Sequence, residues 1–403
     1  MNLEMYKNIP YQKRDCCMVC GRKNSVPAIE LPHFPLTELY VKKKPSQMLG
    51  FVDQEFYVCS HCDHGQIGNV IDIKLQYGDS MMYNFRTSQS ITGRMTTDFF
   101  IKFFERVSGS RKFKTIVEVG CNDLYLLKKI RNRAKKLVGI DPILKGHERE
   151  LSKDNIIAIG DFLENTALID NMDAIICKDV VEHVADPVGF LKRIVERADG
   201  NAVFFVQVPL LETIMEECRF DQIFHQHLNY FSFKSFLYMI NGLGCDLLDM
   251  AVNYDHWGTG LFAFKKGKSR LRYNFDAPDI TNSEIRNRYI IFKSDLEQVN
   301  KRLTCFRKEK IYGYGAALML AVLSYHMEND FSRFACIMDD DKNKDGMSYL
   351  NLPVSIVHRK KISDLKDAVV LLTAISSKIN VRRMLTNLIG CEPRHIICPL
   401  KIL

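Results

Sequence analysis

Four cysteines near the beginning of the sequence have the spacing of a metal site. Cys17 and Cys20 form one Cys-x-x-Cys pair, Cys59 and Cys62 form a second, and a β-rich segment separates them. Two intervening residues let both thiolates of a pair point at one tetrahedral ion, so this pattern predicts Zn²⁺. Four ligands leave no open position, which indicates a structural site. Three neighbouring side chains are alternative ligands: Cys16, His61 and His64.

Three histidines could carry proton chemistry. His183 comes just after a predicted strand, and His225 and His227 lie in the run Phe220-Asp-Gln-Ile-Phe-His-Gln-His. An imidazole exchanges its proton near neutral pH, which suits a general base. At strand-like spacing, His225 and His227 share one face. A packed core histidine is the alternative for each, but two histidines within three positions favour chemistry.

A glycine turn and a carboxylate predict a nucleotide-type ligand. The run Thr115-Ile-Val-Glu-Val-Gly-Cys-Asn-Asp indicates a strand that turns at Gly120 into a helix, and the next strand ends at Asp141. In doubly wound sheets a ligand binds beyond the carboxyl ends of the strands. Gly120 would let the backbone approach that ligand, and Asp141 would accept hydrogen bonds from a ribose diol. A dinucleotide fingerprint needs three glycines, and only Gly120 is present. The alternative is any α/β domain with a glycine turn.

These side chains need a sheet to position them. Apolar runs alternate with helical segments in the middle of the chain and predict a mostly parallel sheet. Asp161 follows the third of these strands, where it could bind an adenine amino group. The predicted strands are 115–119, 137–140, 156–159, 173–177, 202–208 and 246–252.

A second Rossmann-like unit is predicted towards the end of the chain. The run Glu309-Lys-Ile-Tyr-Gly-Tyr-Gly-Ala indicates a strand, a turn and a helix, and the helix start after Gly315 could hold a diphosphate. A non-binding α/β domain is an equally good interpretation of this pattern. The further strands are predicted to begin at Ile337, Leu352, Val369 and His395.

The segment between the cysteines and the central strands is predicted to be a linker or a lid. As a lid, it would lay Tyr83 over the cleft of the central domain. Thr87 or Ser90 could cap a helix that ends near Val107. The predicted division of the chain is a zinc-binding domain, a linker or lid helix, a central domain, a charged helical linker and a C-terminal domain, at residues 1–80, 81–113, 114–279, 280–307 and 308–403.

Composition bounds the class of protein. The 403 residues are 46% hydrophobic and 26% charged, which is ordinary globular composition. The net charge of +8 comes from 56 basic and 48 acidic residues spread along the chain, so it suits an anionic ligand but is no nucleic-acid footprint. No membrane-spanning run and no signal-peptide core are seen. An odd count of 13 cysteines, mostly single, predicts the reducing cytoplasm.

The order of these motifs resembles one family across nearly the whole chain. Zinc knuckles are followed by Tyr83-x-x-x-Thr-Ser-x-Ser, Glu118-Val-Gly-x-Asn-Asp, Glu182-His, the histidine run from Phe220, and Tyr312-Gly-x-Gly-Ala. This order resembles the zinc-containing, S-adenosylmethionine (SAM)-dependent C-methyltransferases of nucleotide-linked 4-keto-deoxysugars. The resemblance implies a cytoplasmic α/β enzyme of branched-sugar synthesis. It also implies a class I SAM methyltransferase domain in the middle and a C-terminal Rossmann-like domain that helps to hold the nucleotide sugar.

The resemblance also assigns roles to residues. His227 falls on the family's base, His183 on an active-site histidine near the sugar carbonyl or the base, and Tyr83 in a segment with a substrate-contacting tyrosine. His225 and Gln226 are further candidates at the catalytic site. The candidate SAM-contacting positions are Glu118, Gly120, Asn122, Asp141, Asp161, Phe162 and Lys178.

Several positions depart from the family pattern. Leu124 replaces a usual glycine and would crowd the cofactor turn, and Gln226 cannot raise the basicity of a neighbouring histidine as a carboxylate would. The other departures are Phe224 for tyrosine, Gln207 for an acid, and Trp257-Gly-Thr-Gly-Leu for Gly-Gly-Ser-Leu-Arg. Two alternatives therefore stand beside a methyltransferase: an isomerase of a nucleotide keto sugar that acts without SAM or with its assistance, and a non-catalytic nucleotide-sugar or SAM-binding partner. The sequence does not predict an oligomeric state.

Overall fold

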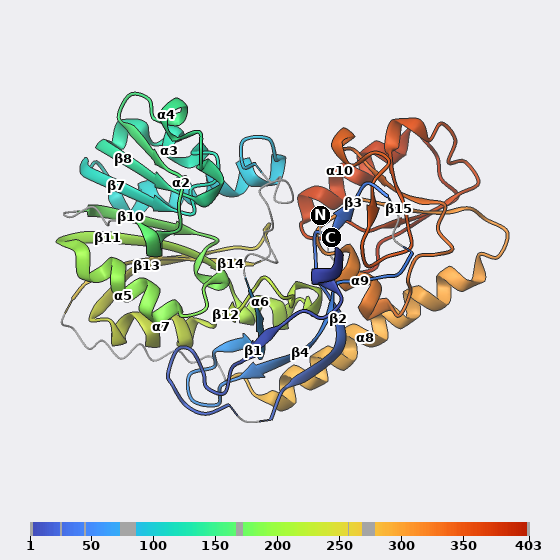
Figure 1. Cartoon of the computed structure of the whole chain (residues 1–403), viewed down its shortest axis with the longest axis horizontal. Helices are drawn as coiled ribbons and strands as arrows, with labels where there is room; N and C mark the ends of the chain where they lie inside the picture. Colours follow the sequence, from blue (N-terminus) through green and yellow to red (C-terminus); the bar gives the residue numbers. More distant parts are fainter. Residues whose placement is uncertain are drawn as a thin grey trace.

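The computed structural model describes residues 3–24, 26–43, 46–72, 86–166, 172–256, 258–267 and 279–400. A seven-stranded sheet forms the central part of the chain (Figure 1). Its strands are, in spatial order, β13 (Cys245–Asn253), β14 (Thr259–Lys266), β11 (Ala198–Pro209), β10 (Met172–Lys178), β7 (Phe113–Val119), β8 (Ala134–Ile140) and β9 (Ile156–Ile159). The last five are parallel, and β14 runs antiparallel to both β11 and β13.

The middle strands are apolar without alternation because both of their faces are buried. In β10, Ile175 and Cys177 belong to one apolar core, whereas Ala174 and Ile176 belong to another on the opposite face. Such continuous runs are what a parallel sheet covered on both faces requires. All six central strands predicted from the sequence are confirmed, and β14 was missed.

Helices cover the two faces of this sheet. On one face lie α2 (Ile91–Ser108) and α3 (Tyr125–Lys129), and on the other lie α5 (Pro187–Arg197) and α7 (Phe233–Gly242). Ser90 caps α2, because its hydroxyl accepts a hydrogen bond from the Gly93 N–H. Two shorter helices, α4 (Glu148–Leu151) and α6 (Leu211–Glu216), follow β8 and β11.

The N-terminal residues build a small antiparallel sheet that takes one strand from the histidine segment. Its order is β12 (Asn229–Tyr230), β5 (Gly65–Ile67), β4 (Phe51–Val58) and β2 (Ile29–Pro35). A two-stranded ribbon, β1 (Tyr11–Lys13) with β6 (Asn69–Ile71), lies beside it. Because β12 directly follows His227 and Leu228, this sheet fixes the end of the histidine segment.

The C-terminal residues form a parallel five-stranded sheet. Its order is β18 (Ile356–His358), β16 (Cys336–Asp339), β15 (Ile311–Tyr314), β19 (Val369–Leu372) and β20 (His395–Ile397). The strand predicted from Leu352 is wrong: the third strand begins at Ile356, after Pro353, which lacks the N–H that a ladder needs. The helices of this part are α9 (Leu320–Met327) and α10 (Lys378–Ile389).

The N-terminal and C-terminal parts share one apolar core. Phe34 and Phe56 of the N-terminal sheet, Phe292 of α8 (Asn282–Cys305) and Ile337 of β16 all belong to it. The short strands β3 (Tyr40–Val41) and β17 (Ser348–Tyr349) also pair across these parts. Figure 1 shows α8 running alongside both the N-terminal and the C-terminal part. The segment predicted as a helical linker is thus a packed helix of the core.

Among the described residues, no helix combines the length and apolar character that crossing a membrane requires.

Candidate active site and zinc site

The four cysteines come together as the spacing predicted. The Sγ atoms of Cys17 and Cys62 are 3.6 Å apart, those of Cys20 and Cys59 are 3.4 Å apart, and all four lie within 4.8 Å of one another. A tetrahedron with Zn–S bonds of about 2.3 Å has S–S edges of about 3.8 Å. The four thiols therefore fit one zinc ion.

Both Cys-x-x-Cys pairs lie in matching turns. The Gly21 N–H donates to the Cys17 carbonyl and the Asp63 N–H donates to the Cys59 carbonyl, with φ of 72° and 58° at Gly21 and Asp63. The pKa of Cys17 falls to about 5 because its thiolate accepts hydrogen bonds from Cys62 and from backbone N–H groups. A thiolate is the form that binds zinc.

The alternative ligands point elsewhere. Cys16 is exposed, and His64 lies buried with Nε2 3.4 Å from Asn229 Oδ1. The His61 ring packs against Tyr238.

The glycine turn after β7 is tied to the carboxylate at the end of β8. Asp141 accepts hydrogen bonds from the backbone N–H groups of Asn122 at 2.8 Å and Ile143 at 3.0 Å. Gly120 has φ 72°, and a side chain there would collide with Val180. Burial raises the pKa of Asp141, which these hydrogen bonds and Arg86 oppose. Each carboxylate oxygen has a second lone pair, so Asp141 can still accept hydrogen bonds from a diol.

Glu118 gives this edge an unpaired acidic group. It is the residue before the last of β7 and is almost fully buried, and its Oε2 has no hydrogen-bond partner among the described residues. Burial raises its pKa well above the ordinary value, although Lys178 opposes this. An orphaned buried carboxyl favours a ligand with donors or positive charge. SAM carries both, so Glu118 and Asp141 fit this cofactor.

Leu124 does not crowd the cofactor turn. It has φ 63° and ψ 19°, in the left-handed region, but its side chain is fully buried in the core shared by α2 and α3. There it contacts Gly139 of β8, where an added side chain would collide with it. The sequence-based expectation of an obstruction is wrong because the left-handed turn directs the side chain into the core. The isomerase alternative loses the departure that motivated it.

Replacing Leu124 with glycine is therefore expected to destabilise the protein and not to tighten SAM binding. Relief of the left-handed backbone returns about 1–2 kcal/mol, whereas loss of a buried leucine costs about 2–5 kcal/mol. Thermal unfolding beside Leu127→Ala, a buried leucine of α3 in the same core, measures the difference. A Leu124→Gly protein that is more stable and binds SAM more tightly would restore the obstruction.

The adenine-side candidates lie on the rim. Asp161 is half-buried, and its Oδ1 accepts hydrogen bonds from Asn165 and from the Phe162 N–H, which lower its pKa. Phe162 is exposed, at 39%. An exposed aromatic ring beside a carboxylate suits a base that stacks and donates an amino group.

Lys178 belongs to a polar network at the end of β10. Its Nζ donates to Asp179 at 2.6 Å, and Gln207 of β11 donates to the other oxygen of Asp179 at 2.7 Å. In the family that the sequence resembles, position 207 is usually an acid. Here it is a glutamine, and its side-chain amide donates a hydrogen bond to the Asp179 carboxylate.

His183 and His227 form a pair at the carboxyl end of β10. Their ring centroids are 4.8 Å apart, and His183 Nδ1 lies 2.7 Å from the Gln226 carbonyl oxygen. Burial lowers the pKa of both histidines, and the positive charge of His183 lowers that of His227 further. The neutral imidazoles can therefore accept protons. The buried carboxyl of Glu182 lies within 4.8 Å of both rings.

His225 does not join this pair, which corrects the prediction of a shared face. The segment is a turn and not a strand, because the His227 N–H donates to the Phe224 carbonyl. The ring of His225 contacts the N-terminal sheet, with Nδ1 3.0 Å from Gln54 Nε2 and Nε2 3.2 Å from the Phe34 carbonyl oxygen. His225 is a packed core histidine.

Arg14 was not singled out in the sequence, yet it holds the two histidine-bearing segments together. Its guanidinium donates to the Leu228 carbonyl at 2.8 Å and to the Ala185 carbonyl at 2.7 Å. Asn229 adds a donation to the Val184 carbonyl at 2.7 Å. Arg14 and Leu228 are 214 positions apart, so no local pattern could reveal this contact.

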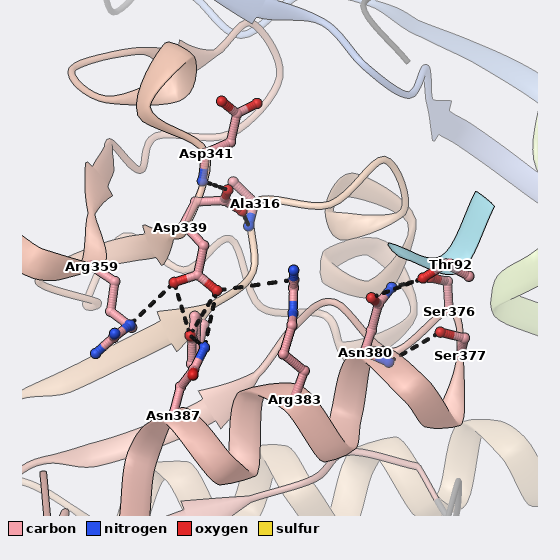
Figure 2. A network of polar contacts seen from close by, with 12 residues as sticks. Thr92, Ala316, Asp339, Asp341, Arg359, Ser376, Ser377, Asn380, Arg383 and Asn387 are labelled. Carbon is pink, nitrogen blue, oxygen red and sulfur yellow. Dashed lines mark hydrogen bonds and ion pairs between the residues drawn. The ribbon is translucent and has the colours of Figure 1, made fainter. Parts of the chain in front are cut away.

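The second glycine turn repeats the arrangement of the first. Asp339, at the end of β16, accepts hydrogen bonds from the backbone N–H groups of Ala316 and Asp341 at 2.6 and 2.8 Å (Figure 2). Helix α9 begins only at Leu320. The Ala316 N–H thus already has an acidic acceptor, which does not support the diphosphate expected after Gly315.

Two arginines lie beside this turn. Asp340 accepts hydrogen bonds from Tyr314 and from Arg359, at 2.9 and 3.1 Å, and Arg383 of α10 lies 4.0 Å away. The N-terminal turn of α2 meets α10 where Thr92 donates to Asn380 at 3.1 Å. The two arginines face the Asp340 carboxylate, which stands between Asp339 and Asp341 in the chain.

Two predicted positions, Tyr83 and Trp257, lie outside the described residues.

Residues 93–249 match the family model of a methyltransferase domain. The C-methyltransferase NovU of Streptomyces niveus is 23% identical over 265 residues, which cover 61% of this chain and 59% of NovU. The chain thus spans about three fifths of the length of this curated relative.

Similar solved structures include a putative SAM-dependent methyltransferase from Listeria monocytogenes, at 10% identity and TM-score 0.36, with 42% of this chain and 98% of that chain covered. The N-methyltransferase NodS from Bradyrhizobium japonicum, in complex with S-adenosyl-L-homocysteine, has 11% identity and TM-score 0.36, with 48% and 95% covered. The family match places a methyltransferase domain in the central part of the chain.

Proposed function

We propose that the protein is a SAM-dependent C-methyltransferase that acts on a nucleotide-linked keto-deoxysugar. The observation that carries this proposal is the neutral His183–His227 pair, which stands at the same sheet edge as Glu118 and Asp141. Methylation at carbon needs a base beside the methyl donor, because a C–H bond next to a ketone must first lose its proton. The similarity to a C-methyltransferase supports the same reaction.

In this proposal, Glu118, Asp141 and Asp161 hold SAM by its amino group, ribose and adenine. SAM, when bound, supplies an electrophilic methyl group and leaves as its demethylated thioether. His227 takes the proton from the carbon beside the ketone, and the electron pair of that C–H bond passes to the ketone oxygen. The carbon then forms its new bond to the methyl group, and His227 releases its proton to solvent. The chain's contribution is positioning and proton transfer.

His183 has a defined proton arrangement in this scheme. A neutral His183 that donates from Nδ1 to the Gln226 carbonyl leaves its lone pair on Nε2. Nε2 is then an acceptor that can bind a hydroxyl of the substrate or take the proton itself. His183 is therefore the second candidate for the base.

We further propose that the C-terminal part holds the nucleotide. Arg359 and Arg383 offer positive charge at the carboxyl edge of the C-terminal sheet, which suits a diphosphate. The contact of α2 with α10 places this edge next to the central part.

The first experiment is mass spectrometry of ligands released from the purified protein, followed by incubation with isotopically labelled SAM and a nucleoside diphosphate 4-keto-6-deoxyhexose. Label on a sugar carbon supports the proposal, and a protein that neither binds SAM nor labels the sugar contradicts it.

Replacement of Asp141 with alanine is expected to weaken SAM binding by about 1.5–3 kcal/mol, the range for losing hydrogen bonds to a charged group. Calorimetric titration with SAM measures this change. Asp98→Ala, an exposed aspartate of α2, is the matched control and should leave the affinity unchanged. Because Asp141 also holds the glycine turn, thermal unfolding is measured in parallel. Equal affinities in the folded Asp141→Ala and wild-type proteins would place SAM elsewhere.

A further inference from the structure

Glu182 brings a buried carboxyl group to the histidine pair. It lies in the short 3-10 helix Val181–His183, directly before His183, and is 1% exposed. Its Oε2 has no hydrogen-bond partner among the described residues. A buried carboxyl oxygen costs free energy unless it meets a donor or a positive charge. The Glu182 side chain therefore suits a ligand that the chain itself does not supply.

The carboxyl group and the two imidazoles have the spacing of a metal site. One carboxylate oxygen of Glu182 and one ring nitrogen each of His183 and His227 lie within 4.8 Å of one another. In a tetrahedral site with ligand bonds of about 2.1 Å, the ligand atoms are about 3.4 Å apart. Each pair is thus at most about 1.4 Å wider than ligation requires, which small side-chain rotations can remove. Two imidazoles and one carboxylate are a donor set that Zn²⁺ and other divalent transition metals take.

His183 has the outer hydrogen bond that is typical of a metal ligand. Its Nδ1 lies 2.7 Å from the Gln226 carbonyl oxygen, and donation from Nδ1 leaves the lone pair on Nε2. Metal-binding histidines almost always donate their other N–H to a carboxylate, a backbone carbonyl or water, which fixes the orientation of the ring. The His183 ring is therefore oriented before an ion binds.

Backbone carbonyls hold the two ligand-bearing segments against each other. The Leu228 N–H, one residue after His227, donates to the Glu182 carbonyl at 2.8 Å. The side chain of Asn229 donates to the Val184 carbonyl at 2.7 Å. Neither contact uses the Glu182 carboxyl group, so both can persist when that side chain is changed. A substitution at Glu182 can therefore test the site without releasing the segments.

We propose that Glu182, His183 and His227 form a second metal site, which binds one divalent transition-metal ion such as Zn²⁺. It has three protein ligands and no thiolate, so it should hold zinc less tightly than the four cysteines do. The ion takes the lone pair of His227 that the proposed base needs, so bound metal prevents removal of the sugar proton. This inhibition rests on the function proposed above, whereas binding of the ion does not.

The test uses Zn²⁺ alone as the probe and the full-length protein, dialysed against a weak chelator that leaves about one zinc per chain in the four-cysteine site. Calorimetric titration should show a second ion per chain. Glu182→Gln keeps the size of the side chain and removes its charge. It should weaken this second binding more than about 10-fold, since even the loss of an outer-shell partner costs about 10–100-fold.

Glu212→Gln is the matched control. Glu212 also has a buried carboxyl oxygen without a hydrogen-bond partner among the described residues, but it lies outside the group of three ligands. This variant should bind the second Zn²⁺ as wild type does. His183→Asn is the second test variant, because asparagine can keep a donor near the position of Nδ1 but lacks Nε2. It should lose the ion as well, and thermal unfolding shows which variants keep the fold.

Exchange of the sugar proton with D₂O is the second readout. The wild type should exchange the proton beside the ketone without added Zn²⁺ and should stop when the second site is saturated. No second ion in the wild type, equal binding by the wild type and the folded variants, or exchange that continues at saturation would each overturn the metal site or its inhibition. A protein that binds the second ion but never exchanges the proton would overturn the proposed function and leave the metal site standing.

Discussion

Replacement of His227 with alanine is expected to slow turnover by about 10²–10⁴-fold, the usual contribution of a general base, and to leave SAM affinity nearly unchanged. The His227 ring packs between His183 and Phe224, at centroid distances of 4.8 and 4.2 Å. This packing fixes the direction in which its lone pair can point. The methyl donor is already electrophilic, so the step that needs help is removal of the proton beside the ketone.

The pH dependence follows from the direction of the pKa shift. Burial, and then the charge of His183, lower the pKa of His227 well below its ordinary value. A base works in its deprotonated form, which is present above its pKa. The rate should therefore stay level as the pH falls from 8 through about 6.5, where an ordinary histidine would already be half protonated. An acid limb centred near 6.5 would mean that a solvated histidine is the base.

Exchange of the sugar proton with D₂O isolates the role of His227. This exchange needs the base but not the methyl donor, so His227→Ala should abolish it in the absence of SAM. His225→Ala is the matched control: the residue is two positions away and equally buried, but its ring contacts Gln54 and Phe34. It should lower stability and keep the exchange. If His227→Ala exchanges at the wild-type rate, His183 is the next candidate.

The central strands could be predicted from sequence because each is an apolar run bounded by turns. In β10, the residues on both faces of the strand belong to apolar cores. The continuous apolar run in the sequence therefore follows directly from this burial. The run from Leu261 to Phe264 in β14 is just as buried and apolar, but it follows β13 with no helix between them. The alternation of strands and helices that guided the prediction therefore passed over it.

The site was predictable only where function depends on residues close in sequence. The cluster of four cysteines needed two short spacings, and Asp141 needed only the end of a strand. The direction of a side chain was harder to predict, because it depends on the local backbone conformation. The left-handed conformation of Leu124 directs its side chain into the core, and the turn that begins at Phe224 separates His225 from His227. Arg14 could not be found, because its partner Leu228 lies 214 positions away in the chain.

Removal of zinc is expected to have the largest effect on the fold. Structural zinc contributes about 10–16 kcal/mol of apparent binding energy in zinc-finger peptides, which matches or exceeds the whole stability of a typical domain at about 5–15 kcal/mol. Cys59→Ser replaces a thiolate with a hydroxyl that stays protonated, so the site loses a ligand. Elemental analysis should find about one zinc per wild-type chain, as a single four-cysteine site requires, and much less in the variant.

The loss of zinc should spread to the histidine pair. The turn that begins at Cys17 stands three residues after Arg14, and Arg14 donates to the carbonyls of both Ala185 and Leu228. Release of this turn frees the two segments that bring His183 to His227. Hydrogen exchange should therefore rise in residues 11–24, 57–67 and 225–230, and proton exchange on the sugar should fail even when SAM still binds to the central sheet.

Cys16→Ser is the matched control for this experiment. Cys16 is exposed and adjoins Cys17, so its loss removes a thiol from the same segment without touching the cluster of four. It should keep zinc, protection from hydrogen exchange and activity. A zinc-free Cys59→Ser protein with a protected N-terminal sheet would show that the apolar core shared with α8 and β16 holds this sheet by itself. In that case the thiols would be required for neither fold nor site.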